Sequence, residues 1–179
     1  MKKNLEEIIN YIEEVRSDIK NYVQDKEDHL LQNTNDANSW SPNEVLQHLY
    51  KTEIYITELL NRQIERAKKK DLTSVDETTS YLHSLDEFEI EIVNEKFNAP
   101  ELSKPGGSMD SEVVLHQMGE SRSELIKLLR EFSQYDMTGI EFPHPAYGRM
   151  NMIQWVLFLG KHEERHFNQI KQVLKLSGV

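Results

Sequence analysis

Apolar residues recur at alternating steps of three and four along four stretches of the chain, which is the spacing of one face of an α-helix. The stretches cover residues 4 to 25, 42 to 69, 111 to 133 and 151 to 176. The positions that carry the pattern are, in chain order, Leu5, Ile8, Ile12, Val15, Ile19 and Tyr22; Val45, Leu49, Ile56, Leu59 and Ile64; Val114, Met118, Ser121, Leu125, Leu128 and Phe132; and Trp155, Leu159, His162, His166, Ile170 and Val173. The sequence therefore predicts four long amphipathic helices.

Two of these helices have clear start signals. Ser41 precedes Pro42, and Glu44 follows at the third position after the serine, which is the capping-box arrangement. Asn151 and Gln154 have the same spacing before the fourth helix. We therefore expect the second helix to begin at residue 42 and the fourth just after Asn151.

The connections differ in length. Residues 25 to 39 and 134 to 150 are predicted to be loops, the second containing a turn at Pro143 and Pro145. Residues 71 to 110 form a long crossover connection between the second and third helices, in which residues 89 to 93 fit a strand and residues 85 to 94 fit a short helix equally well. Burying four apolar stripes together predicts an all-α fold, a four-helix bundle formed by a single domain over residues 1–179.

The amino-acid composition argues against several classes of function. Asp and Glu outnumber Lys and Arg by 31 to 21, which disfavours phosphate-driven binding of nucleic acid. Cysteine is absent, so the chain has no thiol nucleophile, disulfide or cysteine-ligated metal. The N-terminal residues are charged where a signal peptide is apolar, and no apolar run approaches the roughly 20 residues of a membrane span. We expect a soluble, cytoplasmic protein.

Three of the seven histidines lie on predicted apolar faces. His162 and His166 are one turn apart on the fourth helix, so both rings can reach one ion. His48 lies at the edge of the buried face of the second helix. Three neutral imidazoles suit Zn²⁺, Ni²⁺ or Fe²⁺ and leave a coordination position open, as in catalytic sites. The other interpretation is that each ring lies at the edge of the core and is satisfied by a hydrogen bond.

Residues 162 to 166, His-Glu-Glu-Arg-His, also match the H-E-x-x-H pattern of zinc proteases, in which Glu163 would be the general base. A third ligand often follows downstream in such proteases, but no Asp, Glu or His follows His166. We therefore expect Glu163 to lie at the surface or beside the ligands, without a catalytic role.

Together these motifs resemble the DinB-like superfamily, and within it the YfiT-like branch of metal-dependent hydrolases. The similarity covers nearly the whole chain in the expected order. It lies in Trp40-Ser41-Pro42-x-Glu44-x-x-x-His48, Phe97-x-Ala99-Pro100, Ser121-Arg122, Phe142-Pro143-His144-Pro145-x-Tyr147-Gly148, Gln154-Trp155 and His162-Glu163-x-Arg165-His166.

The resemblance implies a four-helix bundle, often dimeric, in which His48, His162 and His166 bind a divalent metal. Some relatives transfer a low-molecular-weight thiol, such as bacillithiol or mycothiol, to electrophilic substrates, and others are classed as hydrolases. We therefore expect a metal-dependent hydrolase or thiol S-transferase that acts on a small molecule, forms a homodimer and binds neither nucleic acid nor membrane. Besides the ligands, His144, Tyr55 and Arg165 are candidates for the substrate pocket. The alternative is a non-catalytic metal-binding or interaction bundle.

Overall fold

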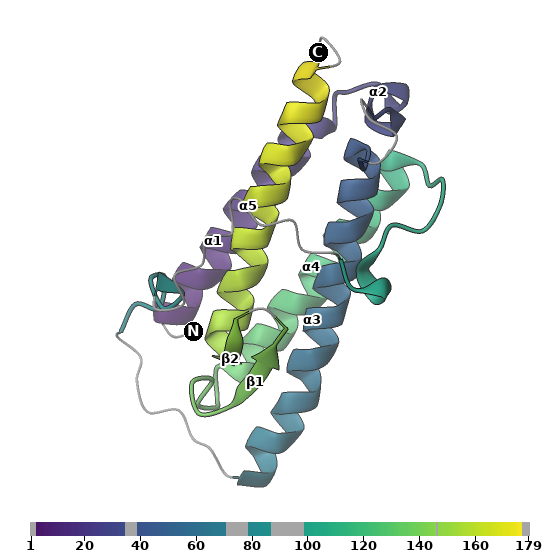
Figure 1. The fold of residues 1–179 in the computed structure, drawn as a ribbon. Coiled ribbons are helices and arrows are strands. Elements are labelled where there is room, and N and C mark those ends of the chain that lie inside the picture. Colours follow the sequence, from purple (N-terminus) through teal and green to yellow (C-terminus); the bar gives the residue numbers. More distant parts are fainter. Residues whose placement is uncertain (1–2, 35–38, 71–78, 87–98, 146, 177–179) are drawn as a thin grey trace.

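The computed structural model describes residues 3–34, 39–70, 79–86, 99–145 and 147–176 of the chain (Figure 1). Its elements are α1 (Lys3–Val23), α2 (Asp28–Gln32), α3 (Pro42–Lys70), the 3₁₀ turn η2 (Glu101–Ser103), α4 (Ser111–Phe132), β1 (Glu141–His144), β2 (Gly148–Asn151) and α5 (Met152–Leu176). The four long helices form a bundle, which confirms the predicted fold class. None of the described helices has the length and apolar character needed to cross a lipid bilayer.

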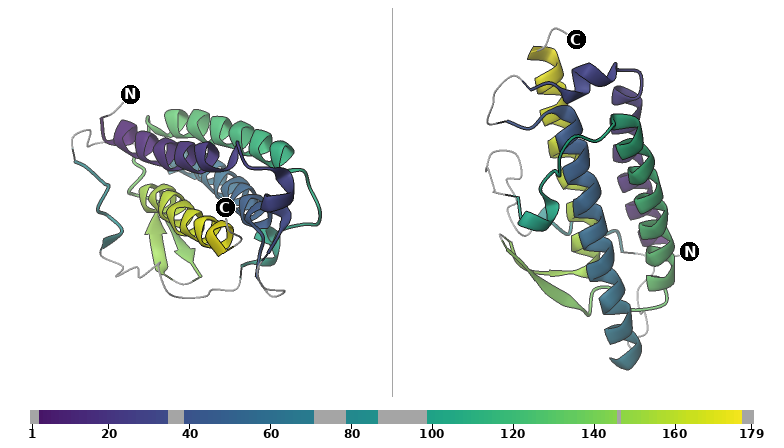
Figure 2. Two further views of the ribbon diagram at one scale, coloured as in Figure 1. Left: turned by 90° about the horizontal axis from the view of Figure 1, so that it is seen from above. Right: turned by 90° about the vertical axis from the view of Figure 1, so that its right-hand side faces the viewer.

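Neighbouring helices in the bundle are α1 and α5, α5 and α3, α3 and α4, and α4 and α1 (Figure 2, left). The helices α3 and α4 run in the same direction, whereas α5 runs in the opposite direction to both (Figure 1). Consecutive parallel helices need a connection that returns along the bundle. This arrangement accounts for the long crossover connection between α3 and α4 that the sequence predicted.

Both capping boxes form as predicted. The Ser41 hydroxyl accepts from the Glu44 amide at 3.2 Å, and the Glu44 carboxylate accepts from the Ser41 amide at 2.8 Å. At the start of α5, the Asn151 side chain accepts from the Gln154 amide at 3.0 Å, and the Gln154 side chain accepts from the Asn151 amide at 2.8 Å. These reciprocal bonds satisfy backbone donors at the first turn and fix where each helix begins.

Two predicted loops contain regular structure, so that part of the prediction was wrong. Residues 25–39 include the helix α2, which is only five residues long and therefore too short to show a helical period. Residues 134–150 include an antiparallel hairpin, in which Phe142 lies opposite Met150 and both are buried. The hairpin is stabilised by packing against the bundle, since an isolated two-stranded hairpin is marginal in water.

The strand and the short helix proposed for residues 85 to 94 fall mainly on residues 87–98, outside the described residues. The described part of the long connection includes η2 and the following residues up to Asp110. Here η2 lies beside α3 (Figure 2, right).

The buried faces agree with the predicted stripes at most positions and differ at a few. In α3 the buried position is Leu60, not Leu59, and in α4 Arg122 and Leu129 are buried where the pattern predicted Ser121 and Leu128. Within the described ranges the core forms two hydrophobic clusters, one around Ile12, Ile56, Leu125 and Leu159 and the other around Ile19, Leu49, Met118 and Ile170.

Four charged side chains lie between these clusters, one from each long helix. We call this group the charged layer: Arg16 from α1, Glu53 from α3, Arg122 from α4 and Glu163 from α5. All four are buried, with relative exposures of 8% for Arg16, 3% for Arg122 and 0% for both glutamates. The charges balance, which keeps the layer neutral in a region that water does not reach.

Candidate metal centre

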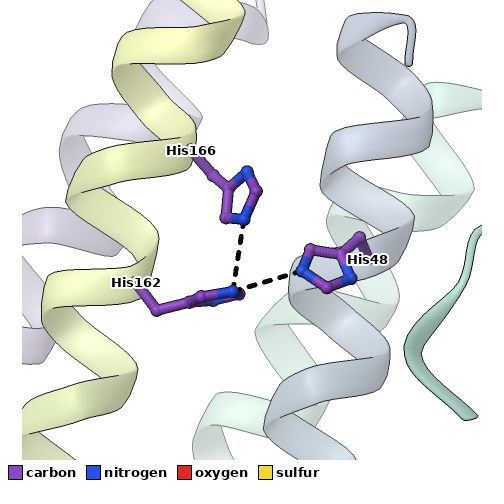
Figure 3. A group of neighbouring side chains, drawn as sticks. All are labelled: His48, His162 and His166. Carbon is purple, nitrogen blue, oxygen red and sulfur yellow. Dashed lines mark hydrogen bonds between the residues drawn. The ribbon is translucent and has the colours of Figure 1, made fainter. Parts of the chain in front are cut away.

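The three histidines on the predicted apolar faces meet between α3 and α5. The Nε2 atom of His162 lies 3.2 Å from Nε2 of His48 and 3.2 Å from Nε2 of His166 (Figure 3). Each ring offers a ligand nitrogen, and these nitrogens all lie within 4.8 Å of one another. We call this group the histidine triad. The structure thus brings together residues 114 positions apart in the sequence.

In two of the three rings, the Nδ1 atom, on the side away from the centre of the triad, forms a hydrogen bond. Nδ1 of His48 lies 2.8 Å from the backbone carbonyl of Ser103, and Nδ1 of His166 lies 2.8 Å from Oε1 of Gln169. A carbonyl oxygen only accepts, so in both rings Nδ1 carries the hydrogen. In the neutral rings, Nε2 of His48 and Nε2 of His166 therefore present lone pairs to the centre of the triad.

This donor set fits a divalent cation. His162 has one Nε2 atom between two acceptors, so in its neutral form it can donate to only one of them. Its other ring nitrogen, Nδ1, is buried and has no hydrogen-bond partner among the described residues. At least one close pair of lone pairs therefore faces each other, and a shared cation removes that repulsion. Bonds of about 2.0–2.1 Å from tetrahedral zinc place ligand nitrogens about 3.3–3.4 Å apart, close to the 3.2 Å that separates His162 from each of the other two rings.

Burial keeps the triad neutral. It lowers the pKa of His162 well below its ordinary value and the pKa of His166 to about 3. It also lowers the pKa of His48, although the bond to Ser103 acts in the opposite direction. Neutral imidazole is the form that binds metal, so the site does not need to lose protons near pH 7.

His144 lies near the triad but belongs to a different cluster. Its ring stacks on Tyr147, with 4.7 Å between centroids, and contacts Phe158 edge-on at 4.6 Å. Phe158 in turn lies 5.6 Å from the ring of His162. Burial lowers the pKa of His144 to about 4, so this ring is also neutral at pH 7. One aromatic side chain thus separates His144 from the triad.

The other two pocket candidates are placed differently. Arg165 is half-buried on α5, and its charge contributes to lowering the pKa of all three triad histidines, so it lies within electrostatic range of the site. Tyr55 is 42% exposed and lies two helical turns beyond His48 on α3. Trp40, which was not among the candidates, contacts the ring of His48 at 4.9 Å between centroids.

Glu163 was expected either at the surface or beside the ligands, and the surface alternative was wrong because the residue is fully buried. Its Oε1 atom accepts from Arg122 at 2.7 Å and also from Arg16, on the side of α5 that faces the charged layer. Two guanidiniums therefore hold the carboxylate that a zinc protease would need as its general base. The match to H-E-x-x-H therefore does not indicate a protease site. The two histidines belong to the triad, whereas Glu163 belongs to the charged layer.

The sequence patterns also missed the partners of Glu163. Glu53 accepts from Arg122 Nε at 2.7 Å, from Arg16 at 3.2 Å and from the Ser121 hydroxyl. A signal was present, because Glu53 lies four residues after Leu49 and three before Ile56. A charged residue at helical spacing within an apolar stripe indicates a buried ion pair when other stripes carry the opposite charge.

Known proteins resemble this chain in sequence and in fold. The family model of the DinB superfamily matches residues 11–170. An uncharacterized protein of Bacillus subtilis, YuaE, is 25% identical over 164 residues, which cover 89% of this chain and 93% of YuaE.

Two solved structures share the fold. The four-helix bundle protein TT2238 superimposes with a TM-score of 0.60 at 17% identity, covering 94% of this chain and 98% of TT2238. YfiT from Bacillus subtilis superimposes with a TM-score of 0.57 at 16% identity, covering 99% of this chain and 90% of YfiT. YfiT is described as a probable metal-dependent hydrolase with an unusual four-helix bundle topology. Because the family model matches most of its length, the chain belongs to the DinB superfamily.

Proposed function

We propose that this protein is a metal-dependent enzyme in which His48, His162 and His166 hold a divalent ion. The observation that carries the proposal is the convergence of three Nε2 atoms, two of which are fixed as lone-pair donors by bonds behind the ring. The description of YfiT as a probable metal-dependent hydrolase supports the same class. Zinc, nickel and iron all suit three imidazoles.

The proposed reaction is hydrolysis of a small molecule, or transfer of a low-molecular-weight thiol of the bacillithiol type to an electrophile. When bound, a divalent ion supplies Lewis acidity, which makes water or a thiol a stronger nucleophile near neutral pH. The chain contains no cysteine, so in the transfer reaction the thiol is a second substrate. We further propose that the protein acts in the cytoplasm as a homodimer and does not bind membranes. We also propose that it does not bind nucleic acid, in keeping with its charge of −10.

The protein's own residues have separate roles in this proposal. Ser103 and Gln169 orient two ligand rings. Arg165 adds positive charge near the triad, which favours an anionic substrate or thiolate. Burial lowers the pKa of His144 to about 4, so the ring is neutral at pH 7 and a weak base, and its proposed role is to hydrogen-bond a substrate held beside Phe158. Tyr55 is assigned to the rim of the pocket because it is exposed.

Metal analysis of purified protein tests the proposal. We expect about one divalent ion per chain in the wild type and a large loss in His162→Ala, while the exposed His116→Ala serves as the matched control and keeps its metal. Equal metal content in the wild type and His162→Ala would refute the proposal.

The reaction is tested separately, with an aryl halide and a thiol for transfer and with ester or amide substrates for hydrolysis. Activity that is lost in His162→Ala supports catalysis. Stoichiometric metal without turnover of either substrate class would favour the non-catalytic metal-binding bundle.

A further inference from the structure

We propose that Gln47, which does not touch the histidine triad, is a positioning residue for His48. It acts through the connection between η2 and α4. This inference rests on the proposed function, because what Gln47 positions is a metal ligand. Gln47 precedes His48 on α3 and is 2% exposed, so its amide must find partners inside the protein.

The contact that Gln47 supports is the bond from His48 Nδ1 to the Ser103 carbonyl, at 2.8 Å. This bond selects the tautomer that leaves Nε2 free for an ion, and it fixes the plane of the ring. Ser103 is the last residue of η2, and its amide donates to Pro100 at 2.9 Å. η2 is only three residues long, so its own hydrogen bonds do not fix where it lies relative to α3. Its location depends on what anchors the connection to α3.

Gln47 is an anchor that bonds to the backbone in both directions. Its Oε1 atom accepts from the Gly106 amide at 3.1 Å, and its Nε2 atom donates to the Gly107 carbonyl at 3.2 Å. A side-chain amide can accept and donate at the same time, which suits one backbone N–H and one backbone carbonyl. Gly107 has a φ of 87°, a left-handed conformation that glycine adopts without strain.

Two other residues of α3 also bond to the backbone of the connection between η2 and α4. Lys51 donates to the Lys104 carbonyl at 2.7 Å, and Asn43 donates to the Met109 carbonyl at 2.6 Å. Asn43, Gln47 and Lys51 are four residues apart and so form a ridge along α3 beside the connection. Of these three, Lys51 is half-exposed and its amine is flexible, whereas Asn43 bonds the connection six residues from Ser103. Gln47 is the buried anchor nearest to Ser103, and we expect it to contribute most to the position of that carbonyl.

The decisive variant is Gln47→Ala, which removes both bonds to the connection and leaves His48 in place. We expect its affinity for Zn²⁺ to fall about 10- to 100-fold, the range for loss of the groups that orient metal ligands. The measurement is competition with a chromophoric chelator. The visible spectrum of Co²⁺ bound at the site should also change, because the geometry of one ligand is altered.

Gln63→Ala is the matched control. Gln63 is on the same helix and is equally buried at 2%, but its side chain forms no hydrogen bond with residues 99–110, the described part of the connection before α4. Both variants remove a buried amide and should lower the stability of the metal-free protein. Only Gln47→Ala should weaken metal binding. An equal effect in the two variants would overturn the inference, because it would show that general loosening of the bundle is sufficient.

A readout on metal-free protein separates this inference from the proposed function. In ¹⁵N NMR, His48 of the wild type should show the Nδ1–H tautomer, and Gln47→Ala should lose that preference while Gln63→Ala keeps it. If the wild type binds no metal, the proposed function fails and the tautomer still decides the role of Gln47. Should Gln47→Ala not fold, Gly107→Ala perturbs the same anchor from the other side, and it should reduce affinity in the same way. Wild-type affinity and tautomer in a folded variant of either kind would refute the role.

Discussion

Replacing Glu53 with glutamine removes one negative charge from the charged layer and leaves the shape of the side chain almost unchanged. Burial raises the pKa of Glu53, but the guanidiniums of Arg16 and Arg122 outweigh burial and hold the pKa below its usual range. The carboxylate is therefore charged at pH 7. In Glu53→Gln, the two arginines share the single carboxylate of Glu163, and the core carries an uncompensated positive charge.

The magnitude follows from how completely the pair is buried. The side chains of Glu53 and its partner Arg122, taken without the backbone, are 0% and 4% exposed, respectively. Removing one partner of such a pair costs about 3–5 kcal/mol, because the remaining charge stays buried without compensation. With a urea m value of about 2 kcal/mol/M, the unfolding midpoint should fall by about 1.5–2.5 M. Urea unfolding of metal-free protein, followed by circular dichroism, measures this shift.

Glu58→Gln is the control on the same helix. Glu58 pairs with Arg62 at 3.6 Å, and both side chains are about two-thirds exposed (65% and 66%). This substitution should change the free energy of unfolding by less than about 1 kcal/mol. If Glu53→Gln were no more destabilised than Glu58→Gln, the argument that burial makes the charged layer energetically important would be wrong.

A double-mutant cycle then tests whether charge balance is the cause. Arg122→Gln alone leaves two carboxylates with the single guanidinium of Arg16, whereas Glu53→Gln with Arg122→Gln restores neutrality. The double variant should lose less stability than the sum of the two single variants, by about 1–3 kcal/mol. Strict additivity would show that the two side chains act independently.

Two further predictions concern packing and pH. Gly160→Ala should destabilise the protein by about 1–3 kcal/mol, because a β-carbon there would overlap the ring of Tyr11. Gly119 has open space around it, so Gly119→Ala should stabilise α4 by about 0.5–1 kcal/mol, and thermal unfolding of both variants measures the difference. In metal-free protein the unfolding free energy should fall as pH drops from about 6.5 to 4, by up to about 1.4 kcal/mol per pH unit for each of His144 and His166. The reason is that the unfolded chain takes up protons on these two rings, whereas burial lowers their pKa values in the folded protein to about 4 and about 3. Urea midpoints that stay constant or rise over this interval would contradict the assignment of neutral buried rings.

The sequence predicted best those features that depend on local chemistry. Capping boxes act within four residues, so the starts of α3 and α5 were found at Pro42 and Met152. The triad was found because the buried faces of α3 and α5 both carry histidine. The hairpin was missed because its stability comes from burying Phe142 and Met150 against the bundle, which is a tertiary effect.

The charged layer was missed for a different reason. Periodicity treats a charged residue as exposed, although Glu53 and Arg16 occupy stripe positions between apolar neighbours. Their burial becomes favourable only when opposite charges on other helices arrive at the same level. No window on one helix contains that information. Similarly, the prediction for Glu163 followed its local polar sequence and not the position of Arg122.

The segment from His162 to His166 contributes to two groups on different sides of α5. The two histidines contribute imidazoles to the triad, and Glu163, the residue after His162, pairs with the two arginines. A shift or rotation of α5 would therefore disturb the triad and the charged layer at the same time. If the triad holds a metal as proposed, a related protein that does not use the metal could lose the histidines. It would still need Glu163, because Arg16 and Arg122 are buried and require its charge. We therefore expect glutamate to be retained at this position even where the histidines are not.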